Sequence, residues 1–275
     1  MAKWWKLWQR WNVDDRRWIS MSKGSLWVWG IVAILAIWFF AGPETALQVF
    51  NTVQNSGIWQ QQVRSPDAAQ FEWSDSYEQF ASTVLWSNDA FWSDLLAQWS
   101  IPYQKPTLVL FRDYTNSACG WASSAIWPHY CPTDQTIYLD ETFFEELTKR
   151  YWAEGWDVAE AYVLSHEVGH HVQNILWLEK WVARTNENSI KTELQADCFA
   201  WFWAWSLKDQ GVFEPGEIGE AIDAAEAVWD DRIQEAATWR VNPESWTHGS
   251  SDDRKKWFTI WYDTTDLSTC DTFAS

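Results

Sequence analysis

The clearest indication of a catalytic site in this chain is a pair of histidines four residues apart, His166 and His170. On an α-helix, residues i and i+4 lie on the same face, so both imidazole rings can bind one Zn²⁺ ion. Glu167 stands beside them, where its carboxylate can act as a general base towards a water molecule. This HExxH pattern therefore predicts metal-dependent hydrolysis.

A third protein ligand is expected, because a catalytic zinc ion usually has three and leaves its fourth position open. Glu193, in the segment ELQAD (residues 193–197), is the best candidate. It lies 23 residues after His170, which allows one helix to end, a loop to turn and a second helix to bring Glu193 to the metal. Asp197, at i+4 from Glu193, can accept the free N–H of a ligand imidazole and fix its tautomer.

A chance occurrence of HExxH in an ordinary helix is the alternative interpretation. Residues 158–164 and 172–176 continue an apolar helical periodicity on both sides of the motif. ELQAD lies in a second apolar segment with helical periodicity, residues 190–207. Two predicted helices that each contribute a ligand favour a metal site over chance.

Further short motifs follow one another along the whole chain. They are NVDDRR (12–17), CG (119–120), PHYCP (128–132), AYVLSHEVGHH (161–171), ELQADC (193–198), DDR (230–232), THG (247–249) and CDTF (270–273). From end to end, this series resembles the neutral zinc metallopeptidases of bacterial envelopes. The resemblance implies a membrane-anchored peptidase with zinc as cofactor and a peptide or protein as substrate, and it carries little information about the natural substrate.

The motifs assign a role to each residue of the predicted site. One Zn²⁺ ion is bound by three ligands, which are His166, His170 and Glu193. Glu167 takes the proton of the attacking water and later delivers it to the leaving amine. Asp197 supports a ligand imidazole from outside the coordination sphere.

The tetrahedral oxyanion of peptide hydrolysis needs a further donor, and His248 in a C-terminal loop is the candidate. A structural role for His248 in that loop is an equally good interpretation. His129 and His171 are interpreted as structural, since three ligands already complete the site. Two other functions stay open: a catalytically silent, membrane-tethered binding or scaffold protein, and a Trp-rich protein that binds glycans or membrane surfaces.

The charge of the chain is unevenly distributed. The formal net charge is −18 at pH 7, but residues 1–24 carry +4, so the remainder is strongly acidic. An acidic body argues against nucleic-acid binding, because phosphate backbones are bound by Lys and Arg surfaces.

Residues 26–42 contain no charged residue and are just long enough to cross a bilayer core. Because the basic residues precede this segment, the sequence predicts a single-pass protein of the cell membrane. Its parts are a cytoplasmic basic N-terminus (1–24), a transmembrane helix (25–42), a stalk (43–66) and an extracytoplasmic zinc metallopeptidase domain (67–275). A cleaved signal peptide and a buried core helix are the alternatives, and the poor cleavage site and the charge asymmetry argue against them.

Four cysteines in an extracytoplasmic domain can form two disulfides, with three possible connectivities. Cys119 and Cys131 bracket a turn-rich loop and are the preferred pair. Cys198 would then pair with Cys270 and attach the C-terminal tail to the ELQAD helix. Zinc binding by these cysteines is the alternative, but no CxxC spacing supports it, and unpaired thiols fit a reducing compartment.

The predicted elements indicate an α+β fold: a mainly helical zincin-like domain with a small β-sheet. A helix is expected within residues 71–98, short strands at 107–111 and 136–140, and mostly helix from residue 141 onward. The strand at 136–140 is a candidate edge strand along which a substrate peptide lies. A wholly buried strand fits the same residues equally well.

Tryptophan usage is anomalous, with 27 Trp against only 11 Gly. Several Trp, such as Trp99, Trp127 and Trp239, stand where the local sequence favours glycine. Positions that resemble glycines of the family are Trp127, Trp177, Trp201, Trp229, Trp239 and Trp261, whereas Trp203 and Trp257 resemble its tryptophans. We hypothesise that the gene belongs to a lineage that reads UGA as glycine, and that these codons were translated as tryptophan.

Overall fold

The structure is a computed structural model in which part of the chain is described. These residues are 2–6, 12–17, 19–20, 63–64, 75–112, 114–123, 128–142, 156–178, 183, 185–213, 217 and 266–274. The predicted transmembrane helix and His248 lie outside them. Within the described ranges, no helix has both the length and the apolar character needed to cross a bilayer.

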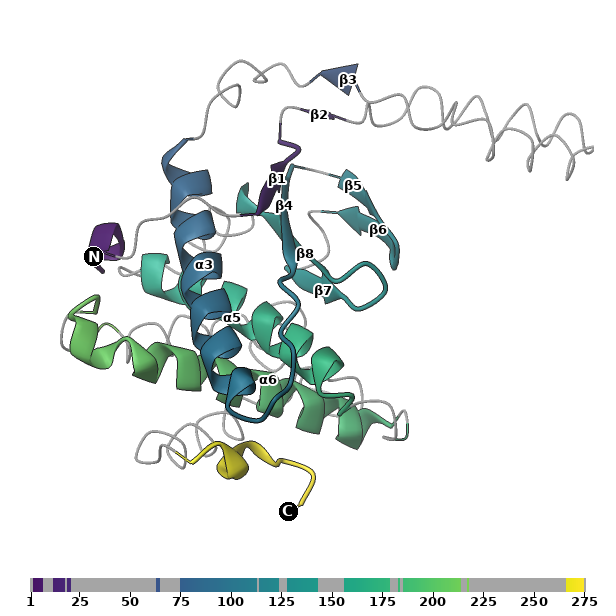
Figure 1. The fold of residues 1–275 in the computed structure, drawn as a ribbon. Coiled ribbons are helices and arrows are strands. Elements are labelled where there is room, and N and C mark those ends of the chain that lie inside the picture. Colours follow the sequence, from purple (N-terminus) through teal and green to yellow (C-terminus); the bar gives the residue numbers. More distant parts are fainter. Residues whose placement is uncertain are drawn as a thin grey trace, which may run out of the picture.

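A four-stranded mixed sheet lies on one side of three long helices, which confirms the predicted α+β class (Figure 1). Its strands, in spatial order, are β1 (Val13–Asp15), β4 (Thr107–Phe111), β8 (Thr136–Asp140) and β7 (His129–Cys131). The first three run parallel, and β7 pairs with β8 in the antiparallel direction. Two small antiparallel pairs complete the described strands: β2 (Ile19–Ser20) with β3 (Val63–Arg64), and β5 (Tyr114–Ser117) with β6 (Gly120–Ser123).

Strand β8 is internal, which corrects one prediction. Both strands expected from the sequence, β4 and β8, are present at the predicted residues. Every residue of β8 is buried, and β4 and β7 flank it on either side. The edge-strand interpretation of 136–140 is therefore wrong and the buried one is correct, while the edge next to it belongs to β7.

The three long helices are α3 (Ser76–Ala97), α5 (Trp156–Ile175) and α6 (Asn186–Ser206). Helix α3 begins where the Asp75 carboxylate accepts a hydrogen bond from the backbone N–H of Glu78, and Thr185 caps α6 in the same way through Asn188. The stripe of α5 that faces the core recurs at helical spacing. Its fully buried members are Ala161, Leu164, Val168 and Val172.

Helix α5 ends in a left-handed residue, Trp177, with a φ of +57°. The backbone N–H of Leu178 donates to the carbonyl of Gln173, 3.1 Å away, and the N–H of Trp177 to that of Asn174. This closing pattern is the one that glycine usually completes, because a Cβ is strained at positive φ. Trp177 is therefore a tryptophan at a position suited to glycine, whereas the left-handed residue after α3 is Ser100 and not Trp99.

The described residues near the N-terminus contact the strands and helices of this folded body. Strand β1 pairs along β4, and the backbone N–H of Ala2 donates to Asp157 at the start of α5. The ring of Trp4 stacks on Trp203 of α6. These residues therefore pack directly against the helices that carry HExxH and ELQAD.

A buried guanidinium, Arg17, joins this N-terminal segment to two other parts of the chain. Its side chain is fully buried and forms ion pairs with Asp15, with Asp75 at the start of α3 and with Glu141 after β8. Arg112 also pairs with Glu141. Removing one member of such a buried group leaves charges without compensation, which typically costs about 3–5 kcal/mol.

Both predicted disulfides are present: Cys119 with Cys131, and Cys198 with Cys270. The second bond attaches the short 3₁₀ helix η6 (Leu267–Cys270) to α6. Together they include all four cysteines of the chain.

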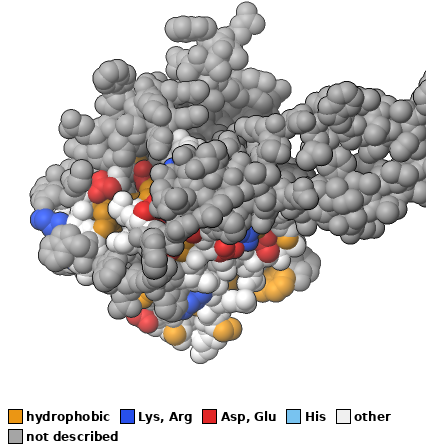
Figure 2. All heavy atoms as spheres, turned by 90° about the horizontal axis from the view of Figure 1, so that it is seen from above, with side chains coloured by type: hydrophobic (Ala, Val, Ile, Leu, Met, Phe, Trp, Pro, Cys, Tyr) orange, Lys and Arg blue, Asp and Glu red, His pale blue; other side chains and the backbone are white. Residues whose placement is uncertain are grey.

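The described surface mixes acidic and apolar side chains. On the face drawn in Figure 2, acidic groups stand between hydrophobic and uncharged ones, and basic side chains stand singly. Among the described residues, the exposed large apolar side chains are Trp99, Trp177 and Trp205. Each of them lies at the end of a different helix.

Candidate metal centre

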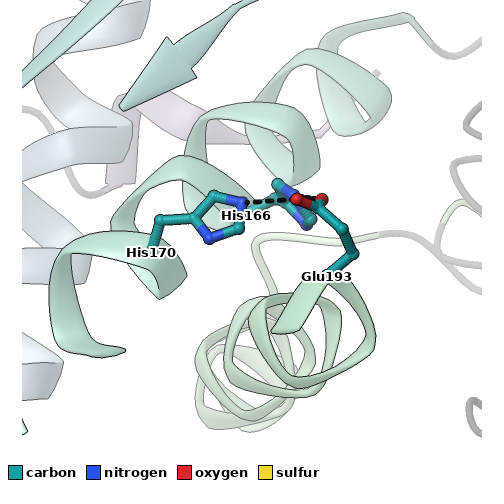
Figure 3. A group of neighbouring side chains, drawn as sticks. All are labelled: His166, His170 and Glu193. Atoms are coloured by element: carbon teal, nitrogen blue, oxygen red, sulfur yellow. Dashed lines mark hydrogen bonds and ion pairs between the residues drawn. The ribbon is translucent and has the colours of Figure 1, made fainter. Parts of the chain in front are cut away.

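Three potential metal ligands converge between α5 and α6. His166 and His170 project from α5, and Glu193 projects from α6 towards both rings (Figure 3). The distances from the Glu193 carboxylate are 3.1 Å to His166 Nε2 and 3.5 Å to His170 Nε2. All three donor atoms lie within 4.8 Å of one another. The i, i+4 spacing thus brings the two rings together as the sequence predicts.

A glycine lets the two helices approach closely enough for this convergence. A Cβ built on Gly169 would lie 2.7 Å from the backbone oxygen of Ala196 and 3.0 Å from its Cα. Such distances are shorter than normal contacts, so any larger residue at position 169 would force α5 away from α6. The glycine within HEVGH therefore sets the distance between the histidines and Glu193.

His166 is oriented by a carboxylate behind it. Its Nδ1 lies 2.7 Å from Asp197 Oδ1, which also accepts a hydrogen bond from the Tyr162 hydroxyl at 2.8 Å. An ionised carboxylate can only accept, so Nδ1 carries a proton and Nε2 faces Glu193 across the site, where a bound metal would take the place of a second proton. Burial opposes protonation of His166, but Asp197 and then Glu193 outweigh it and raise its pKa. The predicted spatial relationship of Asp197 to a ligand imidazole is present.

His170 is oriented by a different group, the side-chain amide of Gln173. Its Nδ1 lies 2.9 Å from Gln173 Oε1. The two histidines thus present the same atom, Nε2, to the site while their Nδ1 atoms bond to different partners. Burial lowers the pKa of His170, and the neighbouring Glu193 carboxylate more than compensates.

Glu167 lies at the site without being one of the converging donors. Its side chain is buried, and burial raises the pKa of its carboxyl above the ordinary value, with His170 and His166 acting in the opposite direction. His129 also acts on this carboxyl electrostatically. A carboxyl whose pKa is shifted towards neutrality can both accept and return a proton.

A cleft of about 250 Å³ opens at these residues. Its walls come from α5, from Glu193 and from the segment around strand β7. The residues that line it are Pro128, His129, Tyr130, Pro132, His166, Glu167, His170, Asn174 and Glu193. The sequence interpretation of His129 as structural did not anticipate that it lines the same cleft as the HExxH residues.

The other histidine interpreted as structural, His171, is fully buried and does not line the cleft. Its Nε2 bonds to the backbone oxygen of Gln104, and its Nδ1 lies 2.9 Å from the Tyr130 hydroxyl, which also accepts from Asn174. Burial lowers the pKa of His171 to about 4, so the ring is neutral at pH 7. In this arrangement His171 holds the hydroxyl of a cleft residue.

The donor set fits a zinc ion. Two imidazole nitrogens and one carboxylate oxygen are typical of catalytic zinc sites, in which a fourth position is left open. Here both imidazoles have their tautomers fixed by bonds at Nδ1, and the three donors face a cleft rather than closed protein. His248 lies outside the described residues.

Several contributors to the site were missed by the sequence interpretation. Gln173 lies three residues after His170 and bonds to it directly, and Tyr162 lies four residues before His166 and acts on it through Asp197. This helical spacing could have indicated both residues from the sequence. Tyr130 and His129 had no such signal, because their position depends on how the sheet packs against α5.

Comparison with known proteins agrees with the geometry. A model of the family described as "Putative neutral zinc metallopeptidase" matches residues 2–273. The "Uncharacterized protein YpfJ" of Escherichia coli K12 is 35% identical over 95% of this chain and 95% of its own length. The "Uncharacterized protein Rv2575" of Mycobacterium tuberculosis is 42% identical over 69% of this chain and 68% of its own length. No solved structure matches the chain.

Proposed function

Because the chain belongs to the neutral zinc metallopeptidase family, we propose that it is an active zinc-dependent peptidase. The observation that carries this proposal is the convergence of His166, His170 and Glu193 at a cleft that Glu167 also lines. A scaffold without turnover would need no general base at this point, and the residue suited to that role is present.

The proposed chemistry divides between the ion and the protein. Zinc, held by the two imidazoles and by Glu193, lowers the pKa of water and polarises the scissile carbonyl when it is bound. Glu167 accepts the proton of the attacking water and returns it to the leaving amine. Asp197 keeps the Nδ1 proton on His166 throughout, so that this ligand does not change tautomer.

The oxyanion requires a donor opposite the general base. His248 remains the proposal made from the sequence. The structure adds His129 as a second candidate, because its ring lines the cleft and acts electrostatically on Glu167. The Tyr130 hydroxyl is less suited to this role, since it already bonds to both His171 and Asn174.

A peptide or protein is the proposed substrate, and β7 is the proposed strand along which it binds. Within the described sheet, β7 (His129–Cys131) is an edge strand whose residues line the cleft. An edge strand offers backbone groups that can pair with an extended peptide. This pairing would bring a scissile bond next to the converging ligands.

The proposed location is outside the cytoplasm, with residues 25–42 as a segment that attaches the protein to the membrane without carrying the chain across it. Two disulfides support an oxidising compartment. The N-terminal strand β1 belongs to the same sheet as β4, so we propose that residues 12–20 are on the same side of the membrane as the peptidase domain. This replaces the cytoplasmic N-terminus predicted from charge. It is incompatible with a single crossing at residues 25–42, because one crossing would put residues 12–20 and the peptidase domain on opposite sides of the membrane.

Zinc analysis combined with a peptidase assay on the full chain tests the proposal. His166→Ala and Glu193→Ala are expected to lose zinc and activity together. Glu167→Gln is expected to keep zinc and lose turnover, since an amide cannot accept the water proton. Full activity of Glu167→Gln would refute the mechanism, and zinc binding by the native protein without cleavage of any peptide would favour the scaffold alternative.

A further inference from the structure

A chain of buried amides connects the second histidine ligand to the C-terminal turn. From His170, it passes through the side chains of Gln173 and Gln195 and ends at the backbone carbonyl of Cys270. Cys270 is bonded to Cys198 of α6, and all four residues after the histidine are buried.

Two backbone carbonyls fix the direction of every hydrogen bond in this chain. Gln173 Nε2 donates to the Thr192 carbonyl at 2.7 Å, and Gln195 Nε2 donates to the Cys270 carbonyl at 2.9 Å. Carbonyl oxygens can only accept, so neither amide can be rotated by 180° without losing a bond. The Gln195 oxygen must then face Gln173 Nε2, at 3.1 Å.

The same constraint extends to the metal ligand. With its nitrogen engaged twice, Gln173 can present only its oxygen to His170. That oxygen accepts, so His170 must carry its proton on Nδ1 and direct its Nε2 lone pair at the site. Thr192 directly precedes Glu193 in the chain, so the Gln173 amide also connects α5 to the backbone next to the third potential ligand.

We propose that Gln173 and Gln195 are positioning residues that connect the C-terminal turn to His170 and fix the tautomer of its ring. The turn itself is held by the Cys198–Cys270 disulfide. This proposal rests on the proposed zinc site. His166 and His170 are thus held by two independent supports, a carboxylate for the first and this amide chain for the second. The C-terminal tail acts on the site although it lies outside the cleft lining.

Two methionine variants of the full-length protein test the proposal, because methionine matches glutamine in length but cannot form these bonds. Gln173→Met is expected to weaken zinc binding about 10–100-fold, the usual loss for a group that orients a ligand. Gln195→Met is expected to cause a smaller loss of the same kind, because Gln173 keeps the Thr192 bond. Gln210→Met, at an exposed glutamine that donates to the nearby Ser206 carbonyl, is the matched control.

Zinc affinity is measured by competition with a chromogenic chelator, and the ring ¹⁵N signals of His170 are recorded by NMR. A purely structural role would lower the melting temperature and leave the Nδ1–H signal of His170 unchanged. The proposal predicts that this signal shifts or exchanges faster in both Gln173→Met and Gln195→Met.

Wild-type zinc affinity and an unchanged His170 signal in Gln195→Met would limit the effect to Gln173 and overturn the connection to the C-terminal turn. Native affinity in Gln173→Met would overturn the whole proposal. Since neither readout requires catalysis, a protein that binds zinc but cleaves nothing would refute the peptidase proposal alone. A native protein that binds no zinc would overturn both.

Discussion

Gly169 of α5 and Ala196 of α6 meet at backbone distance: a Cβ on the glycine would lie 2.7 Å from the alanine's carbonyl oxygen. The contact lies between the ligands on α5 and the ELQAD segment that begins with Glu193. One glycine therefore determines whether the HExxH and ELQAD helices can serve the same ion.

The first prediction is that Gly169→Ala weakens zinc binding more than it destabilises the fold. The added methyl group must push α5 away from Ala196, which moves the histidines relative to Glu193. Zinc affinity and urea unfolding are measured together. Val84→Ala, a core variant on α3, is the control for general destabilisation. An equal zinc loss in both variants would mean that helix spacing is not the cause.

The second prediction concerns Asp197, which orients His166 from behind. Asp197→Ala is expected to reduce zinc affinity or activity about 10–100-fold without emptying the site. Tyr162→Phe, which removes only the hydroxyl that donates to Asp197, is expected to have a smaller effect of the same kind. Complete metal loss in Asp197→Ala would instead indicate that Asp197 is a direct ligand.

The third prediction is that Trp177→Gly stabilises the protein by about 1 kcal/mol, because glycine removes the strain of the left-handed backbone. Trp99→Gly is the matched control: this tryptophan is also exposed but has no positive φ. Urea denaturation of both variants measures the difference, and a loss of stability in Trp177→Gly would contradict the prediction.

The same position tests the hypothesis about the genetic code. If UGA encodes glycine in the source organism, peptides of the native protein should contain glycine at residue 177. Mass spectrometry of these peptides measures this directly. Intact tryptophan at residues 127, 177 and 239 would refute the hypothesis.

The fourth prediction follows from the neutral, buried ring of His171. Burial lowers its pKa to about 4, below the value near 6.5 of an unfolded chain, so the unfolded state binds the extra proton between these values. His171 therefore reduces the free energy of unfolding as the pH falls from about 6.5 to about 4, by up to about 3 kcal/mol.

Comparison with His171→Gln isolates this contribution from other groups. Glu160, whose pKa burial raises to about 8, changes stability in the opposite direction over the acid range. Unfolding free energies of both proteins are measured with chelator present from pH 7.5 to pH 4.5. Parallel curves would show that His171 does not titrate as described.

The fifth prediction is that the two ends of the folded body are accessible from the same side of the membrane. Asp14→Cys in β1 and Lys208→Cys after α6 introduce single exposed thiols, and the native cysteines are all in disulfides. A membrane-impermeant maleimide applied to intact cells should label both variants, and lysed cells provide the maximum signal. Labelling of only one variant would contradict the packing of β1 and α6 in one folded body.

Much of the fold and of the ligand set could be predicted because it depends on local pattern. Apolar periodicity indicated the three helices, and the strands β4 and β8 stand at the predicted residues. The His166, His170 and Glu193 geometry follows from i, i+4 spacing plus one helix-to-helix contact. The helices, the strands and the pairing of the two histidines depend on residues close together in the sequence, and Glu193 needs only the one contact between α5 and α6.

The remaining features depend on pairings between distant segments. The tripeptide Val13–Asp15, which contains two aspartates, has no strand pattern of its own and forms a strand by pairing with β4. The basic residues around it suggested a cytoplasmic tail, although Arg17 is buried among carboxylates. His129 could not be assigned to the cleft, because nothing local indicates which face of the sheet meets α5.

The position of β1 also governs the order in which the chain can fold during synthesis. Val13 pairs with Leu108, 95 residues further on, so the first strand must wait until β4 has been made. Whenever β1 is not in place, the backbone groups of β4 on that side form an open edge, which allows pairing with other chains. A protein shortened at its N-terminus would keep this edge permanently and should aggregate even if every residue of the metal centre is intact.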